Sequence, residues 1–466
     1  MRILHTAAEI FPWVKVGGLG DVLAALPEAL RAIELDARVL LPAYPALKRA
    51  FPQAKAVAGL EDLLGTGPAT FLRDLTPSGV PIYLLDAPSL FDRPGGPYDD
   101  RGDSHLRFGA FSLAAAWFAR HGDEDGWEPE ILNCHDWQTA LTPVYLKVWG
   151  GSRPRTVMTI HNLAYQGLYG PEVLPSLHLP PELMAMDGLE FYGRVNFLKG
   201  GLQVADALTT VSPTYAKEIQ EPAFGEGLDG LLRHRSQALT GILNGVDHRV
   251  WNPATSPHLP HPFSLADLSG KARCKRELQR EMGLEERRDL PLFVVVSRLV
   301  AQKGLDLMLA AVDRLVHEGG QLAVLGAGEA GLESGFGEAA GRHPGRVAVK
   351  VGYDEGLAHR FMGGGDALVV PSRFEPCGLT QLYALAYGAL PVVRRTGGLA
   401  DTVVEGETGF FFEAVDAHAL GDALARACHL FFHDPLAWKR MGLQAMAQDF
   451  GWIPSAQRYR DLYRSL

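Results

Sequence analysis

The chain has 466 residues, 47% of them hydrophobic, which is enough apolar material for two cores and too much length for one ordinary domain. Its formal charge of 44 − 54 = −10 argues against non-specific binding to nucleic acid or to an anionic membrane. There is no run of 18 apolar residues, and the N-terminus passes directly into a strand pattern. Neither a transmembrane helix nor a signal peptide is therefore predicted.

The four cysteines (Cys134, Cys274, Cys377 and Cys428) are far apart and share no CxxC spacing. This pattern argues against a disulfide framework and against a zinc site, and it favours a reducing, cytoplasmic location. Cys377 lies two residues after Glu375, so a nucleophilic thiol is one interpretation. A packed bystander thiol is the other, because no histidine stands nearby in the sequence to activate it.

The first half begins with a strand pattern over Arg2–Glu9, a Gly-rich loop within residues 12–21, and an amphipathic helix that ends near Ile33. The glycines allow the backbone to approach a ligand closely, and Lys15 could place its ammonium group against a phosphate. The spacing matches neither a Walker A motif nor G-x-G-x-x-G. A flexible connection with one surface lysine remains the alternative.

Two polar clusters follow predicted strands further along. The strand at 130–134 runs into His135-Asp136-Trp137-Gln138, and the strand Thr156–Ile160 runs into His161-Asn162. The carboxyl ends of parallel strands are where ligands bind in open α/β sheets. Aromatic faces stack on sugar rings, and Asp, Asn and His bind hydroxyl groups, so the two clusters favour a carbohydrate site over structural histidines. Other predicted elements of this half are the strands Ala37–Leu41, Pro81–Asp86 and Leu208–Val211 and the helix Ser104–Arg120.

Asp123-Glu124-Asp125 is a D-x-D triplet, a pattern that holds a divalent cation in metal-dependent glycosyltransferases. Here it lies in a polar loop flanked by glycines, which favours a solvated loop over a metal site. No metal ligand set is predicted elsewhere. Further on, the Pro-rich stretch 251–262 lacks periodicity and is predicted to be the interdomain linker.

The second half, after a charged helix at Lys271–Met282, alternates strands with helices, which predicts parallel βαβ units. The strand Leu292–Ser297 ends in a segment that carries Arg298 and Lys303. Two cations fixed near a strand end suit a diphosphate. The other predicted elements are the helix Leu305–Glu318, the strands Gln321–Leu325, Val347–Val351, 367–371 and Leu390–Arg394, and a helical tail from Leu420 to Leu466 that breaks at 449–454.

The stretch from Val370 to Gln381 organises this half. It predicts a buried strand, a turn and a helix over Leu379–Tyr387, with Glu375 at the strand-to-helix transition. Backbone N–H groups around Leu379 and Thr380 would favour an anion. One carboxylate beside an anion site favours a phosphorylated, polyhydroxylated substrate. On this stretch alone, an ordinary strand–turn–helix with a solvated Glu375 is the alternative.

Residues 326–331 match G-x-G-x-x-G after a strand, which alone would indicate a dinucleotide cofactor. The match lies in the middle of the chain rather than in a first βα unit, and no acidic residue ends the next strand before Asp354. A tight turn is therefore the preferred interpretation, and an NAD-dependent oxidoreductase remains an alternative that rests on this loop only.

Taken together, these segments resemble bacterial glycogen synthases and the plant starch synthases, which are retaining glucosyltransferases that use ADP-glucose. The matching stretches occur in family order across nearly the whole chain: KVGGLGD (15–21), HDW (135–137), HNLAYQG (161–167), ILNGVD (242–247), RLVAQKG (298–304), GY (352–353), PSRFEPCGLTQLYAL (371–385) and RRTGGLADTV (394–403). Each stretch is weak alone, and the ordered set is specific.

The resemblance implies an α/β protein with two Rossmann-like domains facing across a cleft, the GT-B glycosyltransferase fold, with no metal and no cofactor. It implies an N-terminal domain at 1–243 on the acceptor side and a C-terminal domain at 244–448 for the nucleotide sugar. The last helix, 449–466, would cross back to the N-terminal domain. It also implies two partners, an ADP-glucose donor and an α-1,4-glucan acceptor such as glycogen; the oligomeric state stays open.

Roles follow from the resemblance residue by residue. Glu375, His161, Lys303 and Arg298 would be catalytic, with the two cations holding the diphosphate leaving group. The donor would be bound by Lys15, Gly18, Asp21, Asn244, Tyr353 (stacked on adenine), Cys377, Leu379 and Thr380. The acceptor side would be formed by Asp136, Trp137 and Asn162.

One position departs from the wider pattern, because many retaining enzymes of this fold carry a second Glu eight positions after the first. Here that position is Tyr383, so the ribose contact usually assigned to that Glu is not expected from a carboxylate. Two further alternatives remain at this stage: a glucosyltransferase that uses UDP-glucose or makes a small glucoside, and a catalytically silent glucan-binding scaffold. No segment matches the pyridoxal-phosphate lysine site of glycogen phosphorylase.

Overall fold

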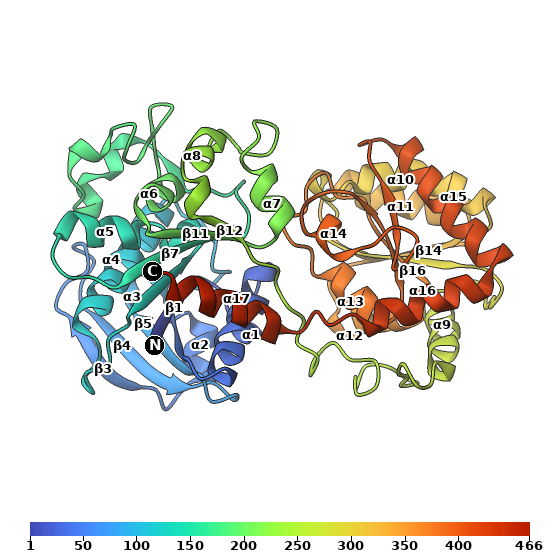
Figure 1. Ribbon diagram of the computed structural model, residues 1–466, viewed down its shortest axis with the longest axis horizontal. Coiled ribbons are helices and arrows are strands. Elements are labelled where there is room, and N and C mark those ends of the chain that lie inside the picture. Colours follow the sequence, from blue (N-terminus) through green and yellow to red (C-terminus); the bar gives the residue numbers. More distant parts are fainter. The chain divides into compact units, whose positions relative to one another are not determined.

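Two α/β units make up the computed structural model, which describes residues 1–466 (Figure 1). Unit 1 comprises Met1–Gly245 together with Trp452–Leu466, and unit 2 comprises Val246–Gly451. Each unit has a hydrophobic core of its own. No helix of the structure combines the length and the apolar character needed to cross a membrane.

Unit 1 is built on a nine-stranded sheet in the order β12-β11-β7-β6-β1-β2-β5-β4-β3. The first seven of these strands are parallel, and β4 and β3 pair antiparallel at one edge. The strands are β1 (Arg2–Thr6), β2 (Asp36–Pro42), β3 (Lys55–Leu60), β4 (Ala69–Leu75), β5 (Pro81–Asp86), β6 (Ile131–His135), β7 (Arg155–Ile160), β11 (Ala207–Thr210) and β12 (Leu239–Gly241).

Helices cover both faces of this sheet. The chain adds β2 and β5 on one side of β1 and then β6, β7 and β11 on the other. Because parallel crossovers are right-handed, this reversal puts α1 on one face of the sheet and α4, α5 and α6 on the other. The C-terminal helix α17 packs on α1, and both chain ends lie in this unit (Figure 1). The helices are α1 (Gly18–Ala32), α2 (Pro45–Ala50), α3 (Pro88–Phe91), α4 (Ser104–His121), α5 (Leu141–Trp149), α6 (Phe197–Val204), α7 (Pro213–Glu218), α8 (Asp229–His234) and α17 (Trp452–Arg464).

A small antiparallel sheet in the order β8-β10-β9 lies in the long segment after β7. Short 3-10 turns at Pro171–Val173, Pro175–Leu177 and Pro181–Leu183 accompany it, each beginning at a proline whose fixed φ suits a helical start. The strands are β8 (Leu168–Tyr169), β9 (Glu190–Phe191) and β10 (Arg194–Asn196). This sheet and the β3–β4 edge were not predicted from the sequence.

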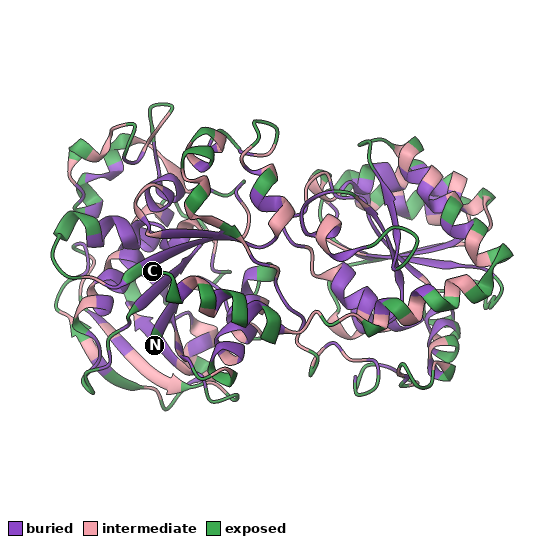
Figure 2. Cartoon of the chain, viewed as in Figure 1, coloured by how far each residue is buried: buried purple, intermediate pink, exposed green.

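Unit 2 has a fully parallel six-stranded sheet in the order β15-β14-β13-β16-β17-β18. Its strands are short and mostly apolar, as expected for strands covered on both faces, and Figure 2 shows them as buried in the middle of the unit. They are β13 (Leu292–Val296), β14 (Gln321–Gly326), β15 (Val347–Val351), β16 (Ala367–Val370), β17 (Leu390–Arg394) and β18 (Phe410–Phe412).

The helices of unit 2 form two groups. Helices α10, α11 and α15 pack in one group, and α9, α12, α13 and α16 pack in the other. They are α9 (Ser269–Glu281), α10 (Leu305–His317), α11 (Ala330–Arg342), α12 (Glu355–Gly364), α13 (Thr380–Ala386), α14 (Gly397–Thr402), α15 (Ala417–His433) and α16 (Pro435–Ala447). The predicted helical tail has an additional break at Asp434, because this residue caps α16 and Pro435 cannot continue α15.

The prediction of a linker at residues 251–262 is wrong. This segment belongs to unit 2, where the Trp251 ring is stacked between His359 and Tyr383 at centroid distances of 3.9 and 3.8 Å. Leu259 is buried in the same core. The Pro-rich composition correctly predicted that this segment has no regular structure. It did not predict that Trp251 and Leu259 would be buried, and their burial holds the segment in unit 2.

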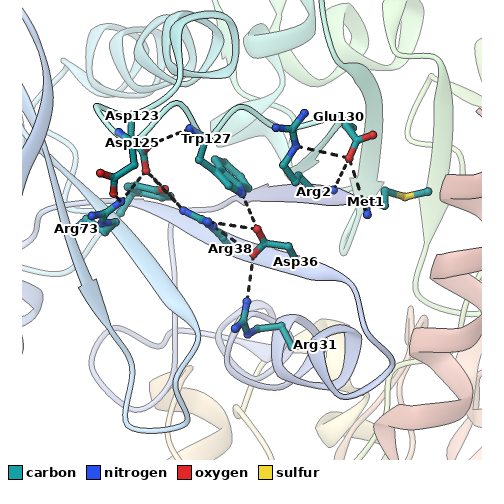
Figure 3. Close-up of polar contacts among 11 residues, drawn as sticks. Met1, Arg2, Arg31, Asp36, Arg38, Arg73, Asp123, Asp125, Trp127 and Glu130 are labelled. Carbon is teal, nitrogen blue, oxygen red and sulfur yellow. Dashed lines mark hydrogen bonds and ion pairs between the residues drawn. The ribbon is translucent and has the colours of Figure 1, made fainter.

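A network of charged side chains occupies the amino-terminal edge of the sheet in unit 1 (Figure 3). Asp123 accepts hydrogen bonds from Arg73 (2.9 Å) and Tyr83 (2.7 Å), and its side chain is 0% exposed, whereas that of Asp125 is 62% exposed. Burial by itself would raise the pKa of Asp123, but the hydrogen bonds from Tyr83, the Trp127 backbone and Arg73 outweigh it and keep the pKa below its ordinary value.

The solvated-loop prediction for the D-x-D triplet is therefore wrong at Asp123, which is a buried ion-pair residue. The structure contains no group of three or more His, Cys, Asp or Glu side chains arranged to hold a metal ion.

Replacing Asp123 with Asn is expected to lower the free energy of unfolding by about 3 kcal/mol, because it leaves two arginines without their buried counter-charge. Asp125→Asn is the matched control and should change it by less than about 1 kcal/mol, since an exposed ion pair contributes little. Urea denaturation of the three proteins measures both effects. Equal losses in the two variants would contradict the assignment of Asp123 as the buried centre of the network.

Candidate active site

In unit 2 the order in which strands are added to the sheet reverses at the first strand, β13. Strands β14 and β15 lie on one side of β13, and strands β16 to β18 lie on the other. The loops that leave the carboxyl ends of β13 and β16 therefore diverge and leave a crevice, the usual ligand site of such sheets. A pocket of about 170 Å³ is found there, and Arg298, Lys303 and Thr380 line it.

Glu375 and Lys303 meet at this crevice. The Nζ of Lys303 lies 2.6 Å from Oε2 of Glu375, and the Ser372 hydroxyl donates to the same oxygen at 2.8 Å. Glu375 is 6% exposed, and a buried carboxylate needs partners within the protein. Here one cation and one hydroxyl group compensate its charge. Arg298 is exposed on the same loop as Lys303 and makes no ion pair within the protein, which leaves its guanidinium available to an anion.

Close backbone packing fixes the loop that carries Glu375. The N–H of Gly398 donates to the carbonyl oxygen of Glu375 at 3.1 Å, and a Cβ at position 398 would overlap the backbone of Cys377. Gly304 is similar, because its φ of 65° and its contact with the Pro371 carbonyl leave no room for a side chain. These glycines and Ser372 are positioning groups that sequence reasoning did not assign.

Three of the other predicted residues of unit 2 lie in the loop after β16 or at the start of α13, and Tyr353 follows the more distant strand β15. Leu379 is the N-terminal cap residue of α13, Thr380 is its first residue, and Cys377 is buried. Tyr353 follows β15 with its side chain 71% exposed, so an aromatic face is open to stacking. The 326–331 loop packs on the segment after β13, and the N–H of Gly328 donates to the Glu333 carboxylate at 2.8 Å. The protein's own carboxylate thus occupies this loop.

In unit 1 the sheet changes direction between β1 and β6, and the predicted polar clusters gather at the carboxyl ends of these strands and of β7. Asp136 adopts a positive φ of 58° and accepts the backbone N–H of His161 at 2.7 Å. Burial raises the pKa of Asp136 to about 7. The structure therefore brings Asp136, His161 and Asn162 together at one edge of the sheet.

Trp137 is less open than the sequence suggested. Its ring packs among Phe108, Tyr169 and Phe197, with centroid distances between 5.0 and 6.3 Å. It remains partly exposed, so one portion of the indole still reaches the surface. Asn244 is buried near the end of β12, and its Oδ1 has no hydrogen-bond partner.

The Gly-rich loop is exposed from Lys15 to Gly18. The Lys15 ammonium binds Asp21 at 2.7 Å. Glu9, which sequence reasoning missed, lies beneath the loop: its Oε2 accepts the N–H groups of Val16 (2.7 Å) and Gly17 (3.0 Å), and Tyr98 donates to Oε1 at 2.5 Å. The signal in the sequence was a carboxylate placed three residues after a buried strand.

Comparison with known proteins identifies the family of this chain. The family described as "Starch synthase catalytic domain" matches residues 2–234, and the family described as "Glycosyl transferases group 1" matches residues 279–434. Glycogen synthases from Paramagnetospirillum magneticum and Variovorax paradoxus are each 50% identical to this chain, over 100% of it and 98% of their own length.

Two solved structures have a similar fold. The catalytic domain of starch synthase IV from Arabidopsis thaliana, bound to ADP and acarbose, is 33% identical with a TM-score of 0.89, covering 100% of this chain and 99% of that one. Sucrose-phosphate synthase from Thermosynechococcus elongatus is 20% identical with a TM-score of 0.63, covering 100% and 98%, and supports the fold alone.

Two α/β units, each built on a mainly parallel sheet with polar groups at the point where the strand order reverses, define a glycosyltransferase of the GT-B fold. The predicted fold class is confirmed. Within that class, the chain belongs to the glycogen synthase family, which includes the plant starch synthases. The resemblance seen in the sequence motifs is thus confirmed as well.

The role of Glu9 can be tested without a substrate. Glu9→Ala removes the acceptor of two loop amides, so the local opening free energy should fall by about 2 kcal/mol and exchange of the Val16 and Gly17 amides should become roughly thirty-fold faster. Hydrogen exchange on peptides that cover residues 10–20 measures this. Tyr98→Phe, which keeps the carboxylate, should have a much smaller effect; unchanged exchange in Glu9→Ala would contradict the assignment.

Proposed function

We propose that this enzyme transfers glucose from ADP-glucose to the non-reducing 4-hydroxyl of an α-1,4-glucan such as glycogen, with retention of configuration. The observation that carries the proposal is the Lys303–Glu375 pair beside Arg298 in the pocket of unit 2, in a chain 50% identical to glycogen synthases over its full length. The starch synthase neighbour bound to ADP supports an adenine nucleotide as the donor.

In unit 2, Arg298 and Lys303 would hold the diphosphate, and their charges would stabilise it as it departs. Backbone N–H groups of Leu379 and Thr380 would add donors to it. Tyr353, with its exposed ring, would stack on the adenine. Glu375 and Cys377 would line the glucosyl site. All these groups lie at or next to the crevice formed by the loops after β13 and β16, apart from Tyr353, which follows β15.

In unit 1, the donor would be met by Lys15, the backbone of Gly18 and Asp21. His161 would bind the glucosyl group, with Asn244 near the sugar. The unpartnered Oδ1 of Asn244 supports a polar ligand there, since buried oxygens are rarely left without a donor. Asp136, Trp137 and Asn162 would face the glucan. On this proposal unit 1 carries the acceptor side and also contacts the donor, whereas unit 2 carries the nucleotide-sugar site.

The proposed reaction is direct transfer without a metal or other cofactor. Retaining glycosidases use a carboxylate nucleophile on the face opposite the leaving group. The sequence motifs supply no second carboxylate convincingly placed for that role, and Tyr383 stands where many related enzymes have one. The acceptor hydroxyl would therefore enter on the side of the leaving group, and the departing diphosphate would take its proton. In an oxocarbenium-like transition state, Glu375 would stabilise the positive charge on the sugar, and the two cations would stabilise the negative charge on the departing diphosphate.

We further propose that the enzyme acts in the cytoplasm, which agrees with its four buried free cysteines. Its partners would be the sugar nucleotide and the glucan, with no nucleic acid and no membrane.

The activity is tested by incubating the protein with glycogen and either ADP-glucose or UDP-glucose, and measuring the nucleoside diphosphate released and the glucose incorporated. ADP release that depends on glycogen, with UDP-glucose a much poorer donor, is the expected result. Equal use of the two donors would refute the adenine preference, and donor hydrolysis without chain extension would refute the transfer to a glucan.

Lys303→Ala is expected to lower kcat by about 10²- to 10³-fold, the effect of removing one preorganised charge from a departing group. Lys439→Ala, an exposed lysine on α16, is the matched control and should leave kcat unchanged. Near-normal turnover in a folded Lys303→Ala protein would show that the leaving group does not depend on this ammonium group.

A further inference from the structure

Three histidines form a continuous hydrogen-bonded chain beneath the carboxyl edge of the sheet in unit 1. Nδ1 of His5, on β1, lies 3.0 Å from Nε2 of His135, the last residue of β6. Nδ1 of His135 lies 2.8 Å from Nε2 of His161, which follows β7. Since β6 lies between β1 and β7 in the sheet, the strand order itself aligns the three rings. His5 and His135 are fully buried and His161 is partly exposed.

All three rings are neutral near neutral pH. Burial lowers the pKa of His5 and of His161 to about 3, and burial together with the neighbouring histidines lowers the pKa of His135 well below its ordinary value. A neutral imidazole has one N–H and one bare nitrogen. Each link of the chain needs one of each, so the three rings must share the same tautomer: a proton on Nδ1 in all of them, or on Nε2 in all of them.

The inner end of the chain selects between these two states. Nε2 of His5 is buried and has no hydrogen-bond partner. With the protons on Nε2, an N–H donor would be left there without an acceptor, and orphaned buried N–H groups are rarer in proteins than under-used acceptors. With the protons on Nδ1, only a bare nitrogen is left. His5 then donates to His135, and His135 donates to His161.

We propose that His5 and His135 are positioning residues that hold His161 as its Nδ1–H tautomer, so that the outer nitrogen of His161 is a hydrogen-bond donor to a hydroxyl oxygen of the sugar. This nitrogen has no partner within the protein. The inference rests on the proposed function, which assigns His161 to the glucosyl group, and it extends the site to two residues that do not touch the substrate.

The tautomer is measured directly by long-range ¹H–¹⁵N correlation spectra of the full chain labelled at histidine, with His161 identified from the His161→Ala spectrum. His359, which is buried in unit 2 and hydrogen-bonded to Tyr387, serves as an internal reference that should not change. The Nδ1–H form is expected at His5, His135 and His161. An Nε2–H form at His161 would overturn the proposal.

Two variants at position 5 separate positioning from packing. His5→Asn keeps an N–H donor near the place of Nδ1, whereas His5→Met fills the space with a thioether, which can accept a weak hydrogen bond and cannot donate one. In His5→Met, an N–H at Nε2 of His135 would gain an acceptor, so we expect His161 to become a mixture of tautomers. We also expect kcat to fall about three- to ten-fold, the loss expected for one hydrogen bond, with KM for the glucan unchanged. His5→Asn should restore both the tautomer and kcat.

Two outcomes for the variants at position 5 would contradict the proposal. An unchanged His161 tautomer in His5→Met, or equal losses of kcat in the Met and Asn variants, would mean that the three histidines only pack the sheet. His161→Ala tests the proposed function separately: normal turnover in that variant would remove His161 from the site even if the spectra showed the coupled tautomers. The two failures are therefore distinguishable.

Discussion

The reversal of strand order beside the first strand of each sheet is the constraint on which the candidate site depends. In unit 2 the strands β13 and β16 are parallel neighbours, so the residues that follow them meet at one edge: Nζ of Lys303 and Oε2 of Glu375, 72 positions apart in the chain, lie 2.6 Å from one another. In unit 1 the same reversal separates the loops after β1 and β6. Both crevices exist because right-handed crossovers allow the direction of winding to change only at such a point.

The two edges of the sheet in unit 1 use buried charge differently. At the amino-terminal edge, Asp123 is fully compensated by arginines and a tyrosine, and the network stabilises the fold (Figure 3). At the carboxyl edge compensation is incomplete. There burial, together with the nearby charge of Glu9, raises the pKa of Asp136 to about 7. Incompletely compensated polar groups at a strand edge are a mark of a ligand site rather than of a structural network.

Tyr383, which departs from the wider pattern of retaining enzymes with this fold, is part of the packing of unit 2. Its ring is stacked on Trp251 with an interplanar angle of 5°, and Trp251 is stacked on His359 on its other face. The position that carries a second carboxylate in many related enzymes therefore anchors the segment 251–262 to the core of unit 2. A carboxylate there would lose this aromatic contact, so the position here serves packing.

The local sequence pattern predicted many of the strands and helices of this protein, but it did not predict which residues its buried polar groups would contact. Apolar runs and turn residues predicted the parallel strands closely, as at Pro81–Asp86 and Val347–Val351, because buried parallel strands are continuous hydrophobic segments. They also indicated which polar residues follow those strands. Tertiary structure alone decided the partners of these residues: Glu9 beneath the Gly-rich loop, Asp123 in a buried network, Trp251 in a core, and His5 and His135 behind His161. Each of these depends on pairing across distant strands or helices, and the energy of burying a polar group is set by neighbours that the adjacent residues in the chain do not specify.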